Sequence, residues 1–225
     1  MPASELAVRC HGLSVDYPTR ATVVHALRDI DAAFGHRRLG VVAGPSGSGK
    51  SSLLRVLAGL QRPTGGRLEI DGTDVTSLRA GPLRRLRRRA MGIVLQDPAD
   101  NLVEYLPAVE QVELAARLRG VDPGGAAALL DVVGLADRAG SYPHELSGGE
   151  QQRVAFAAAA IGTPTLLLAD EPTAELDAAA GDTVVETMRH LVEHGATLVV
   201  ASHDPAVVEA AQDVVTLRDG QVVAA

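Results

Sequence analysis

A glycine-rich loop set between an apolar run and a helical pattern constrains this chain more than any other feature. Leu39–Ala43 is a compact apolar run typical of a buried strand. Residues 44–51 follow it as Gly-Pro-Ser-Gly-Ser-Gly-Lys-Ser, and Leu53, Leu54 and Leu57 then recur at helical spacing. The loop matches G-x-x-x-x-G-K-[ST], whose small residues let backbone N–H groups close on phosphates at a helix N-terminus. The order strand, loop, helix favours a nucleoside triphosphate site over a glycine-rich turn that binds nothing.

The loop carries candidate ligands for the phosphates and for a metal ion. We expect the Lys50 ammonium to neutralise phosphate charge and the Ser51 hydroxyl to coordinate Mg²⁺. The nucleotide-binding residues predicted from this segment are Gly44, Pro45, Ser46, Gly47, Ser48, Gly49, Lys50, Ser51 and Ser52. This motif by itself indicates a nucleoside triphosphate, but not which machine uses it.

Two adjacent acids end a second apolar run, Thr165–Ala169. Ligands of parallel α/β sheets gather at the carboxyl ends of strands, so Asp170 is expected beside the loop of Lys50. There its carboxylate can hold Mg²⁺ directly or through water, while Glu171 can act as general base for the attacking water. A solvated turn is the alternative for an isolated Asp-Glu pair, and the presence of the phosphate loop favours the catalytic interpretation.

Apolar patterns predict an α/β chain with one long stretch that lacks strands. Strands are expected at Leu6–Cys10, Leu13–Tyr17, Leu39–Ala43, Gly66–Ile70, Met91–Leu95, Thr165–Ala169 and Ala196–Ala201, with a terminal hairpin of Val214–Leu217 and Gln221–Val223. Helices are expected over Ser52–Gly59, the arginine-rich segment, Val109–Leu118, Ala126–Val133 and Ala178–Glu193. The βαβ rhythm predicts a parallel sheet, with a helical lobe inserted between roughly Gln96 and Ile161.

Composition narrows the classes of partner. The chain is 46% hydrophobic but only 2% aromatic, so its core must be aliphatic. A net charge of −7 argues against nucleic acid, and no nucleic-acid partner is expected. The basic run Arg84–Arg89 has no interleaved aromatic residues and predicts the solvated face of a helix. A contact with anionic lipid or with a partner subunit is the alternative for this run.

Features of secreted and membrane-spanning chains are missing from the sequence. Cys10 is the only cysteine, so no internal disulfide can form, which fits a reducing compartment. Met1–Glu5 lacks the charged and apolar pattern of a leader peptide. No apolar run approaches the roughly 20 residues of a membrane helix, so we expect any membrane link to come through a partner.

One further motif gives the chain a specific resemblance. Leu146–Arg153, with the sequence Leu-Ser-Gly-Gly-Glu-Gln-Gln-Arg, resembles the signature motif of ABC ATPases, and the match extends in order over nearly the whole chain. The resemblance implies an α/β fold: a P-loop NTPase (RecA-like) core with an N-terminal antiparallel β region and an inserted α-helical subdomain. It implies a single nucleotide-binding domain over residues 1–225, with the core at about 1–95 and 163–225 and the helical subdomain at about 96–162.

The resemblance also implies roles for residues outside the phosphate loop. Tyr17 is similar to the aromatic residue that stacks on adenine, and Gln96 to the glutamine that contacts Mg²⁺ and the nucleophilic water. His203 is similar to the switch histidine that senses the γ-phosphate, and Ala174–Asp177 to a dimer-interface loop. The catalytic residues expected are therefore Glu171, His203 and Gln96, and the metal ligands expected are Ser51, Gln96 and Asp170. The expected cofactors are ATP and Mg²⁺.

The signature is expected to be a second phosphate-binding helix start. Ser147, Gly148, Gly149 and Glu150 open a helix whose N–H groups can face an anion. The inserted lobe should carry them away from the Lys50 site of their own chain. The family resemblance implies a head-to-tail dimer with itself or a related ATPase, in which each signature covers the partner's nucleotide.

Three positions depart from the family pattern. Ser52 stands where threonine is frequent, and Asp97-Pro98 is polar for a segment that abuts the membrane subunit. Glu175 puts a carboxylate where small or amide residues are commoner, which adds negative charge near the partner's nucleotide. None of these removes a catalytic group.

The resemblance to particular groups of ABC ATPases indicates which kind of transport system the chain serves. The length, with no room for a regulatory domain after Ala225, and the segment Tyr142–Glu145 are similar to stand-alone ATPases of lipoprotein-releasing, macrolide-exporting and cell-division systems. We therefore expect a peripheral subunit on the cytoplasmic face of the membrane that energises export or mechanotransmission through separate permease subunits, with residues 97–113 receiving the membrane partner. An importer ATPase is the alternative, and a non-transport ABC ATPase is a third possibility.

Overall fold

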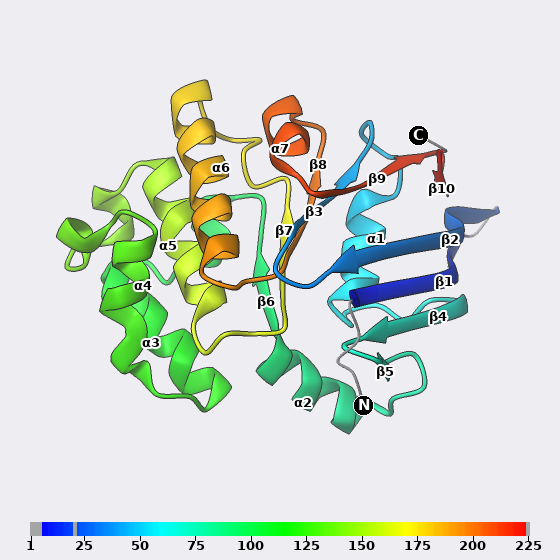
Figure 1. The fold of residues 1–225 in the computed structure, drawn as a ribbon, viewed down its shortest axis with the longest axis horizontal. Helices are drawn as coiled ribbons and strands as arrows, with labels where there is room; N and C mark the ends of the chain where they lie inside the picture. Colours follow the sequence, from blue (N-terminus) through cyan, green and yellow to red (C-terminus); the bar gives the residue numbers. More distant parts are fainter. Residues whose placement is uncertain (1–5, 20–21, 224–225) are drawn as a thin grey trace.

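Two β-sheets organise the chain (Figure 1). The computed structural model describes residues 6–19 and 22–223, so the prediction for Met1–Glu5 lies outside the described residues. A four-stranded antiparallel sheet has the order β2-β1-β4-β5. Its strands are β1 (Leu6–Pro18), β2 (Val23–Gly35), β4 (Gly65–Ile70) and β5 (Thr73–Asp74).

The second sheet has six strands in the order β10-β9-β3-β8-β7-β6. They are β3 (Leu39–Ala43), β6 (Met91–Val94), β7 (Leu166–Asp170), β8 (Leu198–Ser202), β9 (Asp213–Arg218) and β10 (Gln221–Val222). All pairings are parallel except the β9–β10 hairpin. The carboxyl ends of β3 and β7 therefore lie at the same edge of the sheet, which is where the phosphate loop and the acid pair begin.

Seven α-helices accompany these sheets in the part of the chain that the structure describes. They are α1 (Lys50–Leu57), α2 (Ala80–Ala90), α3 (Ala108–Arg119), α4 (Ala126–Val132), α5 (Gly148–Ala160), α6 (Ala178–Glu193) and α7 (Pro205–Ala210). Helix α1 packs on β2, β7 and β8, and α3, α4 and α5 gather at the other end of the molecule (Figure 1). Every regular element between β6 and β7 is helical, and all residues of that interval are described.

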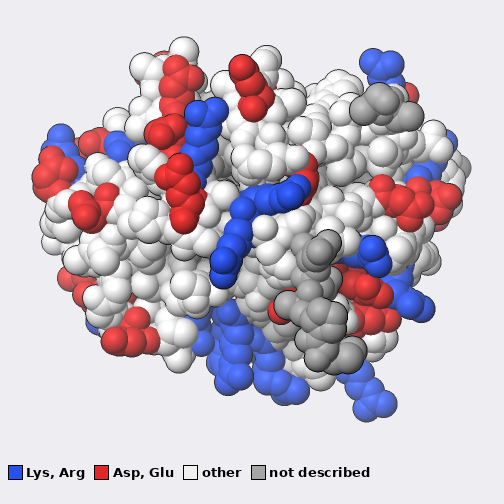
Figure 2. All heavy atoms as spheres, in the orientation of Figure 1, with Lys and Arg blue, Asp and Glu red and all other residues white. Residues whose placement is uncertain are grey.

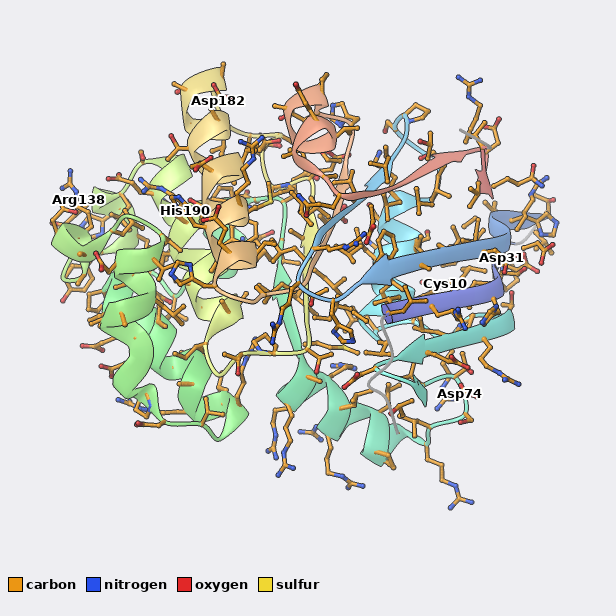
Figure 3. The ribbon with its side chains drawn as sticks, in the orientation of Figure 1. Cys10, Asp31, Asp74, Arg138, Asp182 and His190 are labelled. Carbon is orange, nitrogen blue, oxygen red and sulfur yellow. The ribbon has the colours of Figure 1, made fainter. Side chains whose placement is uncertain are left out.

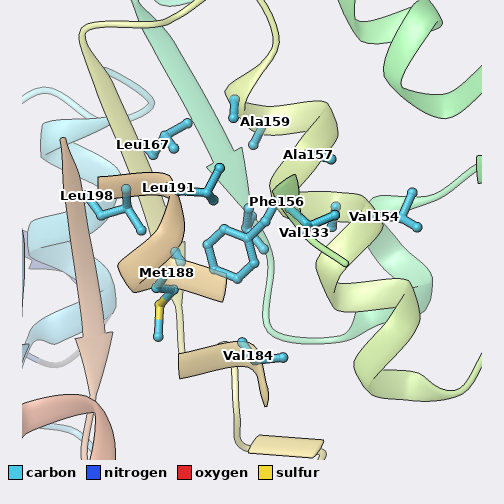
Figure 4. Packing of buried hydrophobic residues seen from close by; sticks show 14 of the residues in the cluster. Val133, Val154, Phe156, Ala157, Ala159, Leu167, Val184, Met188, Leu191 and Leu198 are labelled. Carbon is cyan, nitrogen blue, oxygen red and sulfur yellow. The ribbon is translucent and has the colours of Figure 1, made fainter. Parts of the chain in front are cut away.

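The parallel sheet separates two aliphatic cores because successive side chains of a strand point to opposite faces. On one face, Leu166 and Leu168 of β7 join α1 and the antiparallel sheet in one buried cluster. On the other face, Leu167 lies in a cluster with α5 and α6, where Phe156 and Met188 are fully buried (Figure 4). This two-sided burial explains why the parallel strands are near-continuous apolar runs in the sequence.

Most predicted elements are confirmed, and the α/β class with an antiparallel region and a P-loop core is confirmed by the structure and its matches. The separate strands predicted at Leu6–Cys10 and Leu13–Tyr17 are wrong, because they form one strand, β1. Gly12 has a φ of 56°, and the register with β2 shifts between Cys10 and Leu13, so a bulge joins the two patterns.

The arginine-rich segment forms α2, and none of its residues is buried, which confirms a solvated helix. Figure 2 shows the corresponding cluster of basic side chains along the lower edge of the molecule, where α2 lies in Figure 1. Within the described residues, no helix is both long and apolar enough to span a membrane.

Candidate nucleotide-binding site

The phosphate loop is held in place by close backbone neighbours. Gly44, Gly47 and Gly49 have φ angles of 148°, 77° and 107°, which favour glycine. A Cβ on Gly49 would lie 2.6 Å from the carbonyl oxygen of Ala26 on β2, and one on Gly44 would lie 2.3 Å from that of Leu217 on β9. The loop therefore has its shape because elements of both sheets approach its backbone more closely than a side chain allows.

Lys50 is buried beneath this loop at the start of α1. Its Nζ donates to the carbonyl oxygens of Gly44 at 2.8 Å and Pro45 at 3.1 Å, and lies 3.1 Å from Oε1 of Glu171. These three contacts use all the donors of an ammonium group. A phosphate that binds Lys50 must therefore replace at least one of these three partners.

Ser51 and Asp170 meet at the same edge. The Ser51 hydroxyl donates to Oδ1 of Asp170 at 3.1 Å. Burial raises the pKa of Asp170, an effect opposed by this hydrogen bond and reinforced by the neighbouring charge of Glu171. The paired hydroxyl and carboxylate, with Gln96 lining the same cavity as Ser51, offer the oxygen ligands that Mg²⁺ prefers.

Glu171 is constrained at both its backbone and its carboxylate. Its φ is 46°, unusual for a residue with a side chain, and its N–H donates to the carbonyl oxygen of Ala201 on β8 at 2.9 Å. Its Oε2 lies 2.9 Å from Nδ1 of His203, whose side chain is 65% exposed. Lys50, Glu171 and His203 therefore form one connected chain of polar contacts in the described structure.

A cavity of about 490 Å³ contains most of this chemistry. It is lined by loop residues 46, 47 and 49–52, together with Gln96 and Glu171. A larger groove of about 650 Å³ lies over α2 among its arginines, but no residue of the phosphate loop and no acidic residue lines it. We place the nucleotide site in the smaller cavity because cation, hydroxyl and carboxylate converge there.

Gln96 lines this cavity at the end of the β6 segment. Its Nε2 donates to Oε1 of Glu175 at 3.2 Å, which brings the predicted catalytic glutamine into contact with the residue that departs from the family pattern. Both side chains are exposed.

Tyr17 lies near the loop but does not line the cavity that contains Lys50. Its hydroxyl donates to Oε1 of Gln61 at 2.6 Å and lies 3.4 Å from the Ser52 hydroxyl. Contact with Ser52 places the ring beside the helix that follows the loop. Stacking of Tyr17 on adenine remains a prediction.

The signature residues form the N-terminus of α5. Ser147 is the N-cap, and it exchanges two hydrogen bonds with Glu150: the Ser147 N–H donates to the carboxylate at 2.8 Å, and the Glu150 N–H donates to the hydroxyl at 3.3 Å. The hydrogen bond from the Ser147 N–H holds the pKa of Glu150 below its ordinary value. Gly148 and Gly149 make no backbone N–H hydrogen bond within the described chain, so their amides are free to bind an anion.

None of the signature residues lines the cavity of Lys50 within the described structure. Glu150 lies 3.5 Å from Arg138, which Figure 3 places on the outer side of the helical region, far from Cys10 in the antiparallel sheet. The structure thus does not bring the signature and the phosphate loop into one cavity of a single chain.

Several residues of the site were not indicated by the sequence. His25 and Arg28 of β2 and Asp219 of the β9–β10 turn line the cavity beside the phosphate loop. Asn101 holds the backbone next to Gln96, donating to the carbonyl oxygens of Leu95 and Asp97. The Asp-Gly turn predicted a hairpin, but no sequence signal placed it against the loop.

Comparison with known proteins agrees with this geometry. A family described as "ABC transporter" matches residues 27–174. A macrolide export ATP-binding/permease protein of Paracoccus denitrificans is 40% identical over 221 residues, covering 96% of this chain and 33% of the relative. The chain thus spans about a third of the length of such relatives.

Two further relatives are similar over most of their length. An uncharacterized ABC transporter ATP-binding protein of Thermotoga maritima is 41% identical over 203 residues, covering 88% of this chain and 86% of the relative. A solved dimeric ATP-binding cassette, in a post-hydrolysis state bound to ADP and Pi, has a TM-score of 0.81 and 32% identity and covers 96% of this chain and 97% of that one. The chain therefore belongs to the ABC transporter family and has the fold of this solved ATP-binding cassette.

Proposed function

We propose that the chain binds and hydrolyses ATP to energise export through a membrane permease partner. The observation that carries this proposal is the connected set Lys50, Glu171 and His203, of which the first two line one cavity with Ser51 and Gln96. A cation for phosphate, a base for water and a polar residue beside that base are the parts that phosphoryl transfer to water requires.

The proposed hydrolysis begins when the triphosphate takes the place of Glu171 at Lys50. The released carboxylate then accepts a proton from water as the water oxygen bonds to the γ-phosphorus. The bond from that phosphorus to the bridging oxygen breaks, so ADP leaves and inorganic phosphate forms, while His203 contacts the γ-phosphate. Ser51, Asp170 and Gln96 would hold Mg²⁺, which supplies charge neutralisation at the phosphates when bound. Backbone amides of the loop would orient the phosphates at the start of α1. Tyr17 and Ser52 would lie on the adenine side of the site.

The complete site is proposed to need two chains. Lys50 of one copy and Ser147, Gly148, Gly149 and Glu150 of the other would grip one triphosphate, in a head-to-tail dimer. Support comes from the free amides of Gly148 and Gly149, which lie outside the cavity of their own chain, and from the solved cassette described as dimeric. We also propose that the chain is a single nucleotide-binding domain, in which residues of about 96–162 form a helical subdomain and residues of about 1–95 and 163–225 form the core.

Export is favoured over import because two macrolide export relatives, that of Paracoccus denitrificans and one of Rhodopseudomonas palustris, are similar over 96% of this chain. Their names include a permease, which supports a membrane permease as partner and a position at the cytoplasmic face of the membrane. Residues 97–113 are proposed to receive that partner.

The test compares ATP binding and hydrolysis by the purified chain and two variants. Lys50 is the only lysine of the chain, and Lys50→Ala is expected to weaken the binding of a fluorescent ATP analogue at least about tenfold, since it removes a charged contact to phosphate. Arg189→Ala, which removes one charge from the surface of α6, is the matched control and should bind as the parent does. Unchanged affinity of Lys50→Ala would contradict the phosphate-loop assignment. Failure of any membrane permease to co-purify with the tagged chain from its native membranes would contradict the transport role.

A further inference from the structure

We infer that Glu175 is a positioning residue that fixes the side-chain amide of Gln96, so that the amide oxygen and not the nitrogen faces the Mg²⁺ and water of the ATP site. The inference rests on the proposed function, because it concerns the orientation of a group within that site. It assigns a role to the one carboxylate that departs from the family pattern in the loop after β7.

The backbone around Gln96 is fixed by Asn101. The Leu95 N–H donates to Oδ1 of Asn101 at 2.7 Å, and Nδ2 of Asn101 donates to the carbonyl oxygens of Leu95 at 3.0 Å and Asp97 at 2.9 Å. The residues on both sides of Gln96 are thereby tied to one side chain. Gln152, fully buried on α5, adds a hydrogen bond to the Leu95 carbonyl oxygen at 3.2 Å. What remains to be set is the orientation of the Gln96 side chain.

The two ends of a glutamine amide have nearly the same shape but opposite chemistry. The oxygen accepts hydrogen bonds and can ligate Mg²⁺, whereas the NH₂ group only donates and cannot. Gln96 makes a single side-chain hydrogen bond in the described part of the chain, from Nε2 to Oε1 of Glu175. Because a carboxylate only accepts, it holds the nitrogen toward itself and leaves the oxygen free to accept a hydrogen bond or to ligate a metal ion.

Glu175 itself lies in a loop with fixed backbone. The Ala174 N–H donates to the carbonyl oxygen of Glu171 at 3.1 Å, and the Leu176 N–H donates to that of Thr173 at 3.2 Å. Asp177 then caps α6, accepting from the Ala180 N–H at 2.9 Å. The proposed base and the group that orients Gln96 are therefore carried by one short, hydrogen-bonded segment.

An amide or a small side chain at position 175 would lack this selectivity. An amide can donate or accept, so it would tolerate either orientation of Gln96, and alanine would contact neither end. The substitution Glu175→Gln keeps the size of the side chain but removes its charge and its requirement for a donor, and the double-mutant cycle below separates these two effects. It therefore separates orientation from packing.

The experiment measures Mn²⁺ affinity of the protein–ATP complex by electron paramagnetic resonance, with Glu171→Gln as background to prevent turnover. Glu175→Gln is expected to weaken Mn²⁺ binding about tenfold, the lower end of the loss seen when a group that orients a metal ligand is changed. ATP affinity measured in EDTA should stay unchanged. Glu193→Gln, an equal charge change at an exposed site at the end of α6, should leave both affinities as they are in the background protein.

A double-mutant cycle shows whether the effect passes through Gln96. In a Gln96→Ala protein, Glu175→Gln should have no further effect on Mn²⁺ affinity, because the oriented group is gone. Unchanged Mn²⁺ affinity in the single variant, or an equal loss with and without Gln96, would overturn the inference. If the background protein does not bind Mn²⁺ and ATP at all, it is the proposed function that fails.

Discussion

Two adjacent carboxylates follow β7, and their surroundings give them different chemistry. Asp170 accepts a hydrogen bond from Ser51 and is raised in pKa by burial, whereas Glu171 lies between Lys50 and His203. Each carboxylate therefore has its own set of partners. These surroundings suit Asp170 to the proposed role of metal ligand and Glu171 to the proposed role of base for the attacking water.

Replacing Glu171 tests the base at the scale of one residue. Glu171→Gln keeps the shape of the side chain but cannot accept the proton of water, so kcat for ATP hydrolysis should fall about 10²- to 10⁴-fold. ATP binding should persist, because Lys50 and the loop amides are unchanged. Steady-state phosphate release together with ATP titration measures both quantities. Hydrolysis within about twofold of the parent would remove Glu171 from the role of base.

Asp170 predicts a pH dependence of stability whose sign follows from its raised pKa. The folded, nucleotide-free protein holds this proton more tightly than the unfolded chain does, so the free energy of unfolding falls as pH rises through the window between the two pKa values. Asp170→Asn cannot ionise, and its Tm should exceed that of the parent at neutral pH and match it below about pH 4.

The same variant should lose its response to the metal. Mg²⁺ added with ATP should raise the Tm of the parent but raise that of Asp170→Asn far less, because a ligand of the proposed metal is missing. Asp182→Asn, at an exposed position on α6 (Figure 3), is the control and should respond as the parent does. Differential scanning fluorimetry over a pH series measures all three proteins. A parent and an Asp170→Asn variant of equal Tm at neutral pH would contradict this account.

At the scale of elements, the phosphate loop depends on the strands that approach it. Gly49 and Gly47 both have positive φ, but only Gly49 has a backbone carbonyl, that of Ala26, where a Cβ would lie. Gly49→Ala should lower the free energy of unfolding by more than about 2 kcal/mol, since strain adds to a clash, whereas Gly47→Ala should cost only about 1 to 2 kcal/mol from strain. Urea denaturation of both variants measures the difference. Equal losses would show that β2 does not constrain the loop.

The sequence patterns predicted the parallel sheet well but set no bounds for β2, and the spacing of its buried residues explains why. The buried residues Leu27, Ile30 and Phe34 recur at intervals of three and four, as they would on a helix. A register shift near Asp29, whose φ is 53°, changes which face each later side chain occupies. Local periodicity cannot reveal such a bulge, because the pairing partner that permits it lies on another strand.

The residues of the candidate site also fall into those that the sequence predicted and those that it did not. Motifs located Lys50, Ser51, Asp170 and Glu171, because each lies next to a strand end that the pattern predicts. Asn101 could not be located, since its role is to hydrogen-bond a backbone segment that no motif describes. Helix α7 was also missed, because six residues are too short for a helical period to emerge.

At the scale of the whole molecule, a head-to-tail dimer predicts complementation between two defective chains. Each nucleotide would need Lys50 from one copy and the signature from the other. A mixed pair of Lys50→Ala and Ser147→Arg chains therefore regains one intact site, with Lys50 from the second chain and Ser147 from the first. Neither variant regains a site by pairing with itself.

The readout is ATP-dependent capture, with both chains in the Glu171→Gln background so that a formed dimer persists. A tagged Lys50→Ala chain should retain an untagged Ser147→Arg chain only when ATP and Mg²⁺ are present, while tagged and untagged copies of one variant should not associate. Circular dichroism confirms that Ser147→Arg, which loses an N-cap, remains folded. If each site were completed within one chain, both variants would be defective in any mixture and no pair would be captured. Absence of capture from the mixed pair would therefore contradict a site shared between two chains. Capture of the mixed pair, with no capture within either variant, would show that Lys50 of one chain and Ser147 of the other complete one site.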